Sequence, residues 1–168
     1  MNSRAGNILL VEDDPADIEL TLSVLSQVNL SERTLALRDG EQALDYLCRR
    51  GRWKSRGNGD PAVVVLDLKM PKLSGFDVLR TIKRDERMRL IPVVVFTSSA
   101  EKSDVAACYH EGANGYVVKP GDFAQFACVV EIIGRFWSET NIPPGAPASP
   151  AHRPAKGLRP HGRLRNIQ

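Results

Sequence analysis

Five side chains that can do chemistry stand at the ends of short apolar runs in this 168-residue chain. They are Glu12, Asp13, Asp67, Thr97 and Lys119. Each run is short enough to be a buried strand. A carboxylate is costly to bury alone, so the acids must face a crevice or a cation. Gathered at one place, three carboxylates, a hydroxyl and an ammonium could bind a metal ion and transfer a phosphoryl group.

The three carboxylates would repel one another at close range, and a hard divalent cation would relieve that repulsion. Mg²⁺ takes about six oxygen ligands and keeps several of them as water. Asp13 and Asp67 are the expected direct ligands, with Glu12 acting through a water molecule. The backbone carbonyl of Lys69, two residues after Asp67, is a further candidate ligand. We therefore expect a magnesium site built from these four residues.

The remaining polar residues suit a phosphoryl group bound beside that metal. Lys119 can neutralise the charge of such a group, and Thr97 can donate a hydrogen bond to one of its oxygens. Asp67 is the expected acceptor, because carboxylates form acyl phosphates. Taken singly, Thr97 could be a strand-end hydroxyl and Asp67 a cap at a strand–loop junction. The set of five residues favours the chemical role.

The elements that must position these residues form a repeated strand–helix pattern. The expected strands are residues 7–11, 33–38, 63–66, 91–97 and 115–118. Apolar residues at helical spacing follow each strand, and the last two helices are expected at 102–112 and 123–137. Five such repeats predict an α/β fold, a doubly wound parallel sheet with helices on both faces. In that fold the carboxyl ends of the strands meet at one crevice.

Charge and proline are unevenly distributed along the chain, although the net charge is only +3. Residues 140–168 hold 5 of the 23 basic residues, none of the 20 acidic residues and 6 of the 11 prolines. Residues 1–139 therefore carry 18 basic against 20 acidic side chains. The last segment has too few large apolar residues to offset its ordering entropy. We expect a folded domain over 1–139 and a disordered, basic, proline-rich tail over 140–168.

Several function classes are disfavoured by the sequence. It has no 18-residue apolar run and no signal-peptide core, so we expect no membrane association. Three cysteines without metal-type spacing predict reduced thiols and a cytoplasmic location. A phosphatase with Asp67 as nucleophile usually has a second aspartate two residues on, where this chain has Lys69. Nothing after residue 140 has the helical periodicity of a DNA-binding domain, so we expect no specific nucleic-acid partner. The basic tail would bind anionic polymers or lipids only non-specifically.

Four motifs resemble those of the receiver domains of two-component response regulators, and they occur in the same order. They are residues 11–14 (Val-Glu-Asp-Asp), 66–71 (Leu-Asp-Leu-Lys-Met-Pro), 97–98 (Thr-Ser) and 119–120 (Lys-Pro). The resemblance spans about residues 7–137 and implies a flavodoxin-like sheet with strand order 2-1-3-4-5. It also implies a signalling protein rather than an enzyme, one that catalyses only its own Mg²⁺-dependent phosphorylation and dephosphorylation.

The same resemblance implies partners and roles for the site. Asp67 would accept a phosphoryl group from a histidine kinase, and Lys119 would contact that group. Mg²⁺ would bind at Glu12, Asp13 and Asp67. The exposed basic loop expected at 49–61, with the end of the last helix and the Ile-Pro-Pro after it, resembles the subgroup that serves phytochrome-type photoreceptor kinases.

Two residues would form the conformational switch that controls protein–protein interactions in this family, Thr97 and Tyr116. Taken alone, Tyr116 would be a half-buried aromatic residue of a strand. Lys69 departs from the smaller polar residues that are common two positions after the acceptor. This departure leaves the dephosphorylation rate open.

The last expected helix, residues 123–137, has more apolar surface than packing on a sheet requires. The stripe that would face the sheet is Phe126, Val130, Ile133 and Trp137. Val129 and Phe136 widen this stripe, and Ile132 lies nearly opposite to it. The alternative is a broad core face with one stray exposed isoleucine. Because the family resemblance implies pairing through this helix, we expect a two-fold homodimer whose interface includes Val129, Ile132 and Phe136.

Overall fold

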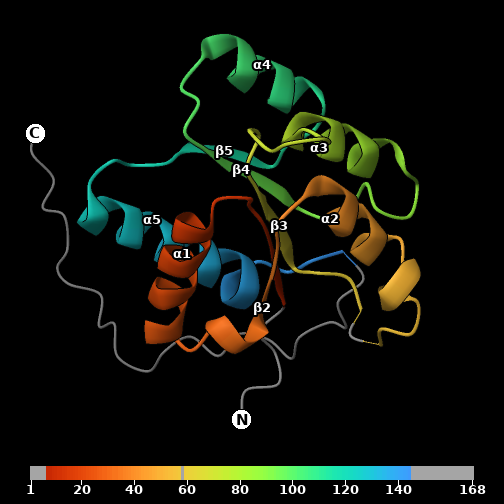
Figure 1. The fold of residues 1–168 in the computed structure, drawn as a ribbon, viewed down its shortest axis with the longest axis horizontal. Coiled ribbons are helices and arrows are strands. Elements are labelled where there is room, and N and C mark those ends of the chain that lie inside the picture. Colours follow the sequence, from red (N-terminus) through yellow and green to blue (C-terminus); the bar gives the residue numbers. More distant parts are fainter. Residues whose placement is uncertain (1–6, 58, 145–168) are drawn as a thin grey trace, which may run out of the picture.

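The computed structural model describes residues 7–57 and 59–144, which form a succession of strands and helices (Figure 1). The strands are β1 (Ile8–Val11), β2 (Thr34–Leu37), β3 (Val63–Leu66), β4 (Val93–Thr97) and β5 (Gly115–Val118). The α-helices are α1 (Pro15–Gln27), α2 (Gly40–Leu47), α3 (Gly75–Arg84), α4 (Lys102–His110) and α5 (Phe123–Arg135). The shorter elements are two 3₁₀ turns, η1 (Ser31–Arg33) and η2 (Gly51–Trp53), and a π-helical turn, η3 (Phe136–Thr140).

The strands form one parallel sheet in the order β2-β1-β3-β4-β5. The predicted doubly wound α/β fold is therefore confirmed, including the strand order 2-1-3-4-5. The register places Val11 of β1 beside Leu66 of β3. As a consequence the next residues, Glu12 and Asp67, leave the sheet side by side.

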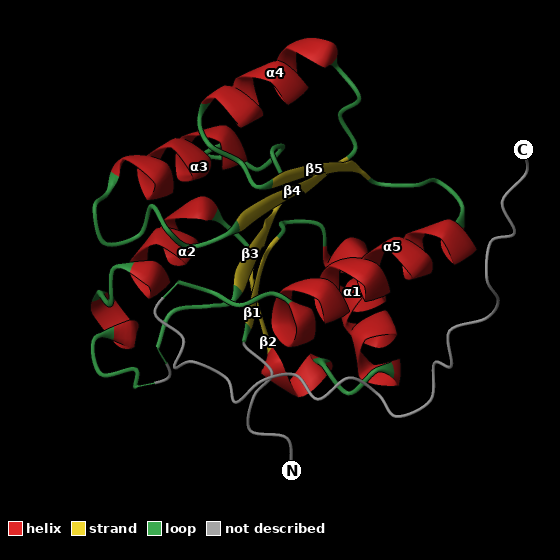
Figure 2. Cartoon of the chain, turned by 180° about the vertical axis from the view of Figure 1, so that it is seen from behind, coloured by secondary structure: helices red, strands yellow, loops and turns green. Residues whose placement is uncertain are grey.

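Helices cover both faces of the sheet, with α2, α3 and α4 on one face and α1 and α5 on the other (Figures 1 and 2). Successive strand residues point to opposite faces. Leu9 and Val11 join the core under α2, α3 and α4, whereas Ile8 and Leu10 join the core under α1 and α5. Strands β1, β3 and β4 are buried along their whole length. Burial on both faces explains why their sequences are continuous apolar runs.

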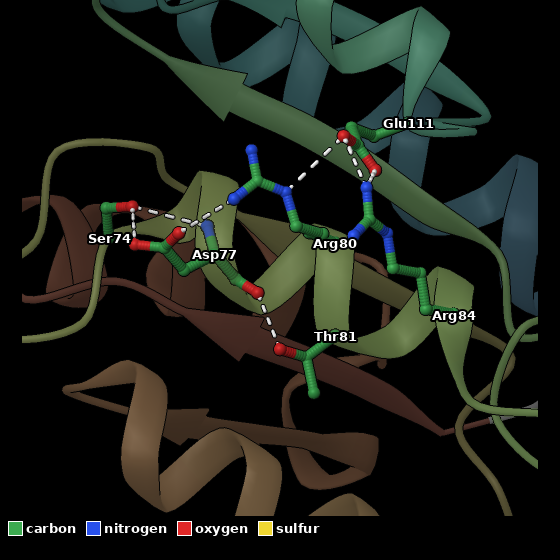
Figure 3. A network of polar contacts seen from close by, with 6 residues as sticks. All are labelled: Ser74, Asp77, Arg80, Thr81, Arg84 and Glu111. Carbon is green, nitrogen blue, oxygen red and sulfur yellow. Dashed lines mark hydrogen bonds and ion pairs between the residues drawn. The ribbon is translucent and has the colours of Figure 1, made fainter.

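Helix α4 is the helix that is least anchored by burial. Among the described residues it buries Cys108 alone, whereas each of the other four α-helices buries four residues. Just beyond its end, Glu111 Oε1 lies 3.4 Å from Arg80 Nε and 3.3 Å from Arg84 Nη2 of α3 (Figure 3). We call these two ion pairs the α3–α4 clamp. Polar contacts therefore accompany the limited apolar packing of α4.

Part of the basic loop between α2 and β3 is folded back on α2. The guanidinium carbon of Arg56 lies 4.2 Å from the centre of the Tyr46 ring, and Arg56 Nε donates to the Tyr46 carbonyl at 2.8 Å. Trp53 packs edge-on against the same ring. The prediction of an exposed loop over 49–61 is therefore wrong for Arg56, whose side chain is 5% exposed because it stacks on an aromatic ring.

The chain stays helical beyond the predicted end of the last helix at residue 137, because η3 continues α5 to Thr140. Within η3 the buried Ser138 donates its hydroxyl hydrogen to the Gly134 carbonyl. Residues 145–168, most of the expected tail, lie outside the described residues, so its disorder stays a prediction. In the part of the chain that is described, no helix is long and apolar enough to cross a membrane.

Candidate functional site

Three acids meet where the neighbouring strands β1 and β3 end. Carboxylate oxygens of Glu12, Asp13 and Asp67 lie within 4.8 Å of one another. The backbone fixes this arrangement, because the Asp67 N–H donates to the Val11 carbonyl at 3.0 Å and so extends the β1–β3 pairing by one residue. The sequence-predicted acidic cluster is thus present in the structure.

Asp67, one of the three acids of the cluster, is 6% exposed. Its Oδ2 atom is 3.6 Å from Lys119 Nζ, and its Oδ1 atom has no hydrogen-bond partner among the described residues. A buried carboxylate oxygen without a partner is costly unless a cation or a donor reaches it. The donor set therefore fits a hard divalent cation, which prefers carboxylate oxygens. Lys69 has an exposed side chain, and the role of its backbone carbonyl stays a prediction.

Lys119 contacts three carboxylates from the end of β5. Its ammonium nitrogen lies 2.6 Å from Glu12 Oε2 and 2.7 Å from Asp17 Oδ2, closer than the 3.6 Å to Asp67 Oδ2. The backbone N–H of Lys119 donates to the Thr97 carbonyl at 2.8 Å, which fixes the residue beside β4. Sequence reasoning missed Asp17. The signal that could have found it is an acid in the first turn of the helix that follows the acidic pair.

Burial and charge act in opposite directions on the two most enclosed groups. Burial raises the pKa of Glu12, and the hydrogen bonds from Lys119 and from the Asp14 N–H reduce this shift without cancelling it. Burial alone would lower the pKa of Lys119, but its hydrogen bonds to Asp17 and Glu12 outweigh that effect and raise the pKa. Lys119 is therefore an ammonium at neutral pH, as a counter-ion for a phosphoryl group must be.

Gly75, the first residue of α3, lies directly behind the acceptor residue. A Cβ atom at this position would lie 1.9 Å from the carbonyl oxygen of Asp67. The Gly75 N–H donates to the Leu68 carbonyl at 3.0 Å, which closes the turn between β3 and α3. Because glycine has no Cβ, it permits an approach of two backbones that no other residue allows. Sequence reasoning missed this role.

Thr97 and Tyr116 both contact Ser99, in the loop between β4 and α4. The buried Thr97 accepts the N–H of Ser99 at 3.4 Å, and the Tyr116 hydroxyl donates to the Ser99 carbonyl at 3.0 Å. The Ser99 hydroxyl in turn donates to Asp104, in the first turn of α4, at 2.6 Å. One loop therefore links both predicted switch residues to α4. Sequence reasoning did not find the parts played by Ser99 and Asp104.

A family model described as "Response regulator receiver domain" matches residues 8–131. The chain belongs to this receiver family. The probable methanogenesis regulatory protein FilR2 of Methanothrix harundinacea is 41% identical, over 82% of this chain and 87% of its own. The response regulator Rcp1 of Synechocystis sp. is 37% identical, over 83% of this chain and 93% of its own.

Solved receiver structures share the fold of this chain. The phosphorylated cyanobacterial phytochrome response regulator RcpA has a TM-score of 0.77 at 34% identity, covering 83% of this chain and 99% of its own. The Mn²⁺-bound form of Rcp1 has a TM-score of 0.76 at 36% identity with the same coverage. The bacteriophytochrome response regulator RtBRR has a TM-score of 0.66 at 49% identity, covering 84% of this chain and 85% of its own. Receiver domains bind a divalent metal at an acidic site, as in the Mn²⁺-bound form of Rcp1, and this chain has an acidic cluster of Glu12, Asp13 and Asp67.

The predicted dimer-interface residues of the receiver lie on α5 and η3. Ile132 is 60% exposed and Phe136 is 46% exposed. Val129 is half-buried and packs against the core under α1 and α5. Ile132 and Phe136 therefore present apolar surface to solvent. Val129 exposes only part of its side chain.

Proposed function

We propose that this receiver accepts a phosphoryl group on Asp67 from a histidine kinase and that phosphorylation changes the surface around α4 and β5. The main support is the buried Asp67 carboxylate, whose Oδ1 atom has no partner in the described part of the chain and which lies among two further acids and an ammonium. In the transfer, the bond from phosphorus to the kinase histidine nitrogen breaks as the bond to an Asp67 oxygen forms.

The residues around the acceptor divide the work of that step. Glu12, Asp13 and the acceptor itself would hold Mg²⁺, with the backbone carbonyl of Lys69 as a further ligand. When bound, Mg²⁺ supplies positive charge to the oxygens of the acceptor and of the phosphoryl group. Lys119 supplies a second positive charge, and the Thr97 hydroxyl can donate to a phosphoryl oxygen. Positioning and charge neutralisation of this kind suit phosphoryl transfer.

The switch would act through the loop that holds Thr97 and Tyr116. Phosphorylation adds negative charge and acceptor oxygens beside Thr97. A Thr97 hydroxyl that turns toward these oxygens would weaken its contact with the Ser99 N–H. Because Tyr116 and α4 are bonded to the same residue, both would respond, and the surface over α4 and β5 would change.

We propose two partners, one from the similar structures and one from the exposed apolar residues. A phytochrome-type histidine kinase is favoured by the phytochrome and bacteriophytochrome regulators among the similar structures. A homodimer through α5 is favoured by the exposed Ile132 and Phe136. We propose no specific nucleic-acid partner and no membrane partner. The three free cysteines favour a cytoplasmic location.

Intact-mass spectrometry after incubation with acetyl phosphate tests the acceptor. With Mg²⁺ the wild-type chain should gain one phosphoryl group, and without Mg²⁺ it should gain little. Asp67→Asn should gain none, because an amide cannot form the acyl phosphate. The control Asp45→Asn changes an exposed aspartate of α2 in the same way and should behave like wild type. Equal phosphorylation of Asp67→Asn and wild type would show that the acceptor lies elsewhere.

A further inference from the structure

Lys119 lies closer to two other carboxylates than to the acceptor. Its distances to Glu12 and Asp17 are 2.6 and 2.7 Å, against 3.6 Å to Asp67. An ammonium group has three N–H donors, and two of them are engaged by Glu12 and Asp17. The third donor is left for a phosphoryl oxygen on Asp67, but at 3.6 Å from Asp67 the ammonium is not yet close to the acceptor, and a movement toward it would lengthen one of the two shorter contacts.

The two partners differ in what they lose when Lys119 moves. The side chain of Glu12 is 4% exposed, so water cannot take the place of the ammonium beside its carboxylate. The side chain of Asp17 is 32% exposed, so water can take the place of the ammonium. Removing one partner of a buried ion pair is strongly destabilising, whereas a partly exposed charge is screened. The contact to be released is therefore the one with Asp17.

The position of Asp17 on α1 supports such an exchange. It is the third residue of the helix, and Asp14 caps that helix by accepting the N–H groups of Ala16 and Asp17. The helix N-terminus stabilises negative charge in its first turn. The helix end thus offers Asp17 favourable electrostatics that do not depend on Lys119. Acids are common in the first turn of a helix. The 2.7 Å contact between Asp17 and Lys119, which is 102 positions away, is not explained by that preference.

We infer that Asp17 is a positioning residue that holds Lys119 back from the acceptor and so sets the cost of phosphorylating Asp67. The inference rests on the proposed phosphoacceptor function. Before phosphorylation, Asp17 shares the ammonium with Glu12. Once a phosphoryl group is present on Asp67, Lys119 exchanges Asp17 for a phosphoryl oxygen, and Asp17 turns to solvent.

Fluoroberyllate, which mimics a phosphoryl group on a carboxylate, tests the inference by its affinity at saturating Mg²⁺, measured by titration calorimetry. Asp17→Asn keeps the shape of the side chain and removes its charge, so Lys119 is released more easily. Charge-assisted hydrogen bonds are roughly twice as strong as neutral ones, and partial exposure reduces the difference, so fluoroberyllate should bind about fivefold tighter than to wild type. Asp17→Glu keeps a carboxylate within reach of Lys119 and should restore an affinity near that of wild type.

Asp14→Asn is the matched control, because it removes one negative charge from the same helix end while an asparagine still caps the helix. Tighter binding by Asp17→Asn than by Asp14→Asn, with restoration by Asp17→Glu, supports the positioning role. A purely structural role would instead lower both the melting temperature and the affinity of Asp17→Asn. Equal affinities of the two asparagine variants, or weaker binding by Asp17→Asn, would overturn the inference. If wild type and Asp67→Asn bind fluoroberyllate alike, the proposed acceptor fails as well, which separates the two outcomes.

Discussion

Gly75 allows the start of α3 to pack against the end of β3. The backbone of α3 therefore contacts the backbone of Asp67 directly. A methyl group at this position would overlap the Asp67 carbonyl oxygen at 1.9 Å. No side-chain rotation can relieve this overlap, because the position of a Cβ atom is fixed by its own backbone and the oxygen is itself a backbone atom. The position of Asp67 therefore depends on a residue that contributes no side chain.

We predict that Gly75→Ala destabilises the fold by about 3 kcal/mol, the upper part of the usual range for overpacking a core. The shift that accommodates the new methyl group should displace Asp67 and weaken Mg²⁺ binding. Urea unfolding measures the first effect and calorimetric titration with Mg²⁺ the second. Gly115→Ala is the control, because its new Cβ would meet Val94 at an ordinary 3.7 Å and its stability should change by less than about 1 kcal/mol. Two variants of equal stability would refute the role given to Gly75.

The site residues that can be predicted from the sequence lie at the ends of apolar runs, and those that sequence reasoning missed do not. Asp67, Thr97 and Lys119 each end an apolar run, so strand periodicity alone places them at the crevice. Asp17 and Gly75 lie in or at the start of helices, and their roles depend on partners that folding brings close. Asp17 meets Lys119 across 102 residues, a contact that no local pattern contains.

Helix α4 buries only one residue, so we expect the α3–α4 clamp to contribute to its local stability. We predict that Glu111→Gln, which removes the charge shared by Arg80 and Arg84, accelerates amide hydrogen exchange within residues 102–110 by roughly fivefold. A pair of this exposure contributes at most about 1 kcal/mol, and that energy is lost locally. Exchange measured by mass spectrometry on peptides from α4 checks the result.

The matched control for the clamp is Glu131→Gln, which removes a single ion pair with Arg135 on α5 at 2.8 Å. Helix α5 buries four residues and should show no comparable change. If α4 exchanges at the wild-type rate in Glu111→Gln, then Ser99 and Asp104 alone are enough to hold the helix. The clamp would then have no part in fixing α4.

The strands and helices themselves could be predicted from the sequence, since buried strands are continuous apolar runs and each helix keeps its apolar spacing. Element ends were less predictable. Strand β4 begins at Val93 rather than at residue 91, and η3 extends the last helix to Thr140. At the second of these ends, the Ser138 hydroxyl donates to the Gly134 carbonyl four residues earlier, a local contact that apolar spacing does not reveal.

At the scale of the whole molecule, exposed apolar residues gather at the end of α5 and beyond it. Ile132, Phe136 and Ile142 are 60%, 46% and 73% exposed. We predict a homodimer that Phe136→Glu weakens by at least tenfold, because a charge would have to be buried at an apolar interface. Sedimentation over a wide concentration range, with and without phosphorylation, measures the association.

Leu90→Glu is the control for the dimer, since Leu90 is also exposed, at 59%, but lies between α3 and β4. This variant should associate like wild type. A monomer at every concentration in both phosphorylation states would end the dimer proposal. A folded Phe136→Glu variant that associates as tightly as wild type would remove Phe136 from the interface.

The order of the strands in the sheet could be predicted only from the family resemblance. Alternating strands and helices predict a parallel sheet, but they do not order its strands. The order is set by contacts between distant segments, such as β1 lying between β2 and β3. Local periodicity contains no record of those contacts.

The bond between Glu12 and Lys119 joins residues 107 positions apart, and this separation matters while the protein is being made. A ribosome releases the acids of β1 and β3 first and the ammonium of β5 much later, since synthesis runs from the N-terminus. A growing or prematurely terminated chain that lacks β5 therefore carries the acids without the counter-ion that a phosphoryl group requires. If Asp67 is the acceptor, as we propose, its charged surroundings are complete only once the chain has been made as far as Lys119 in the last strand region of the sheet.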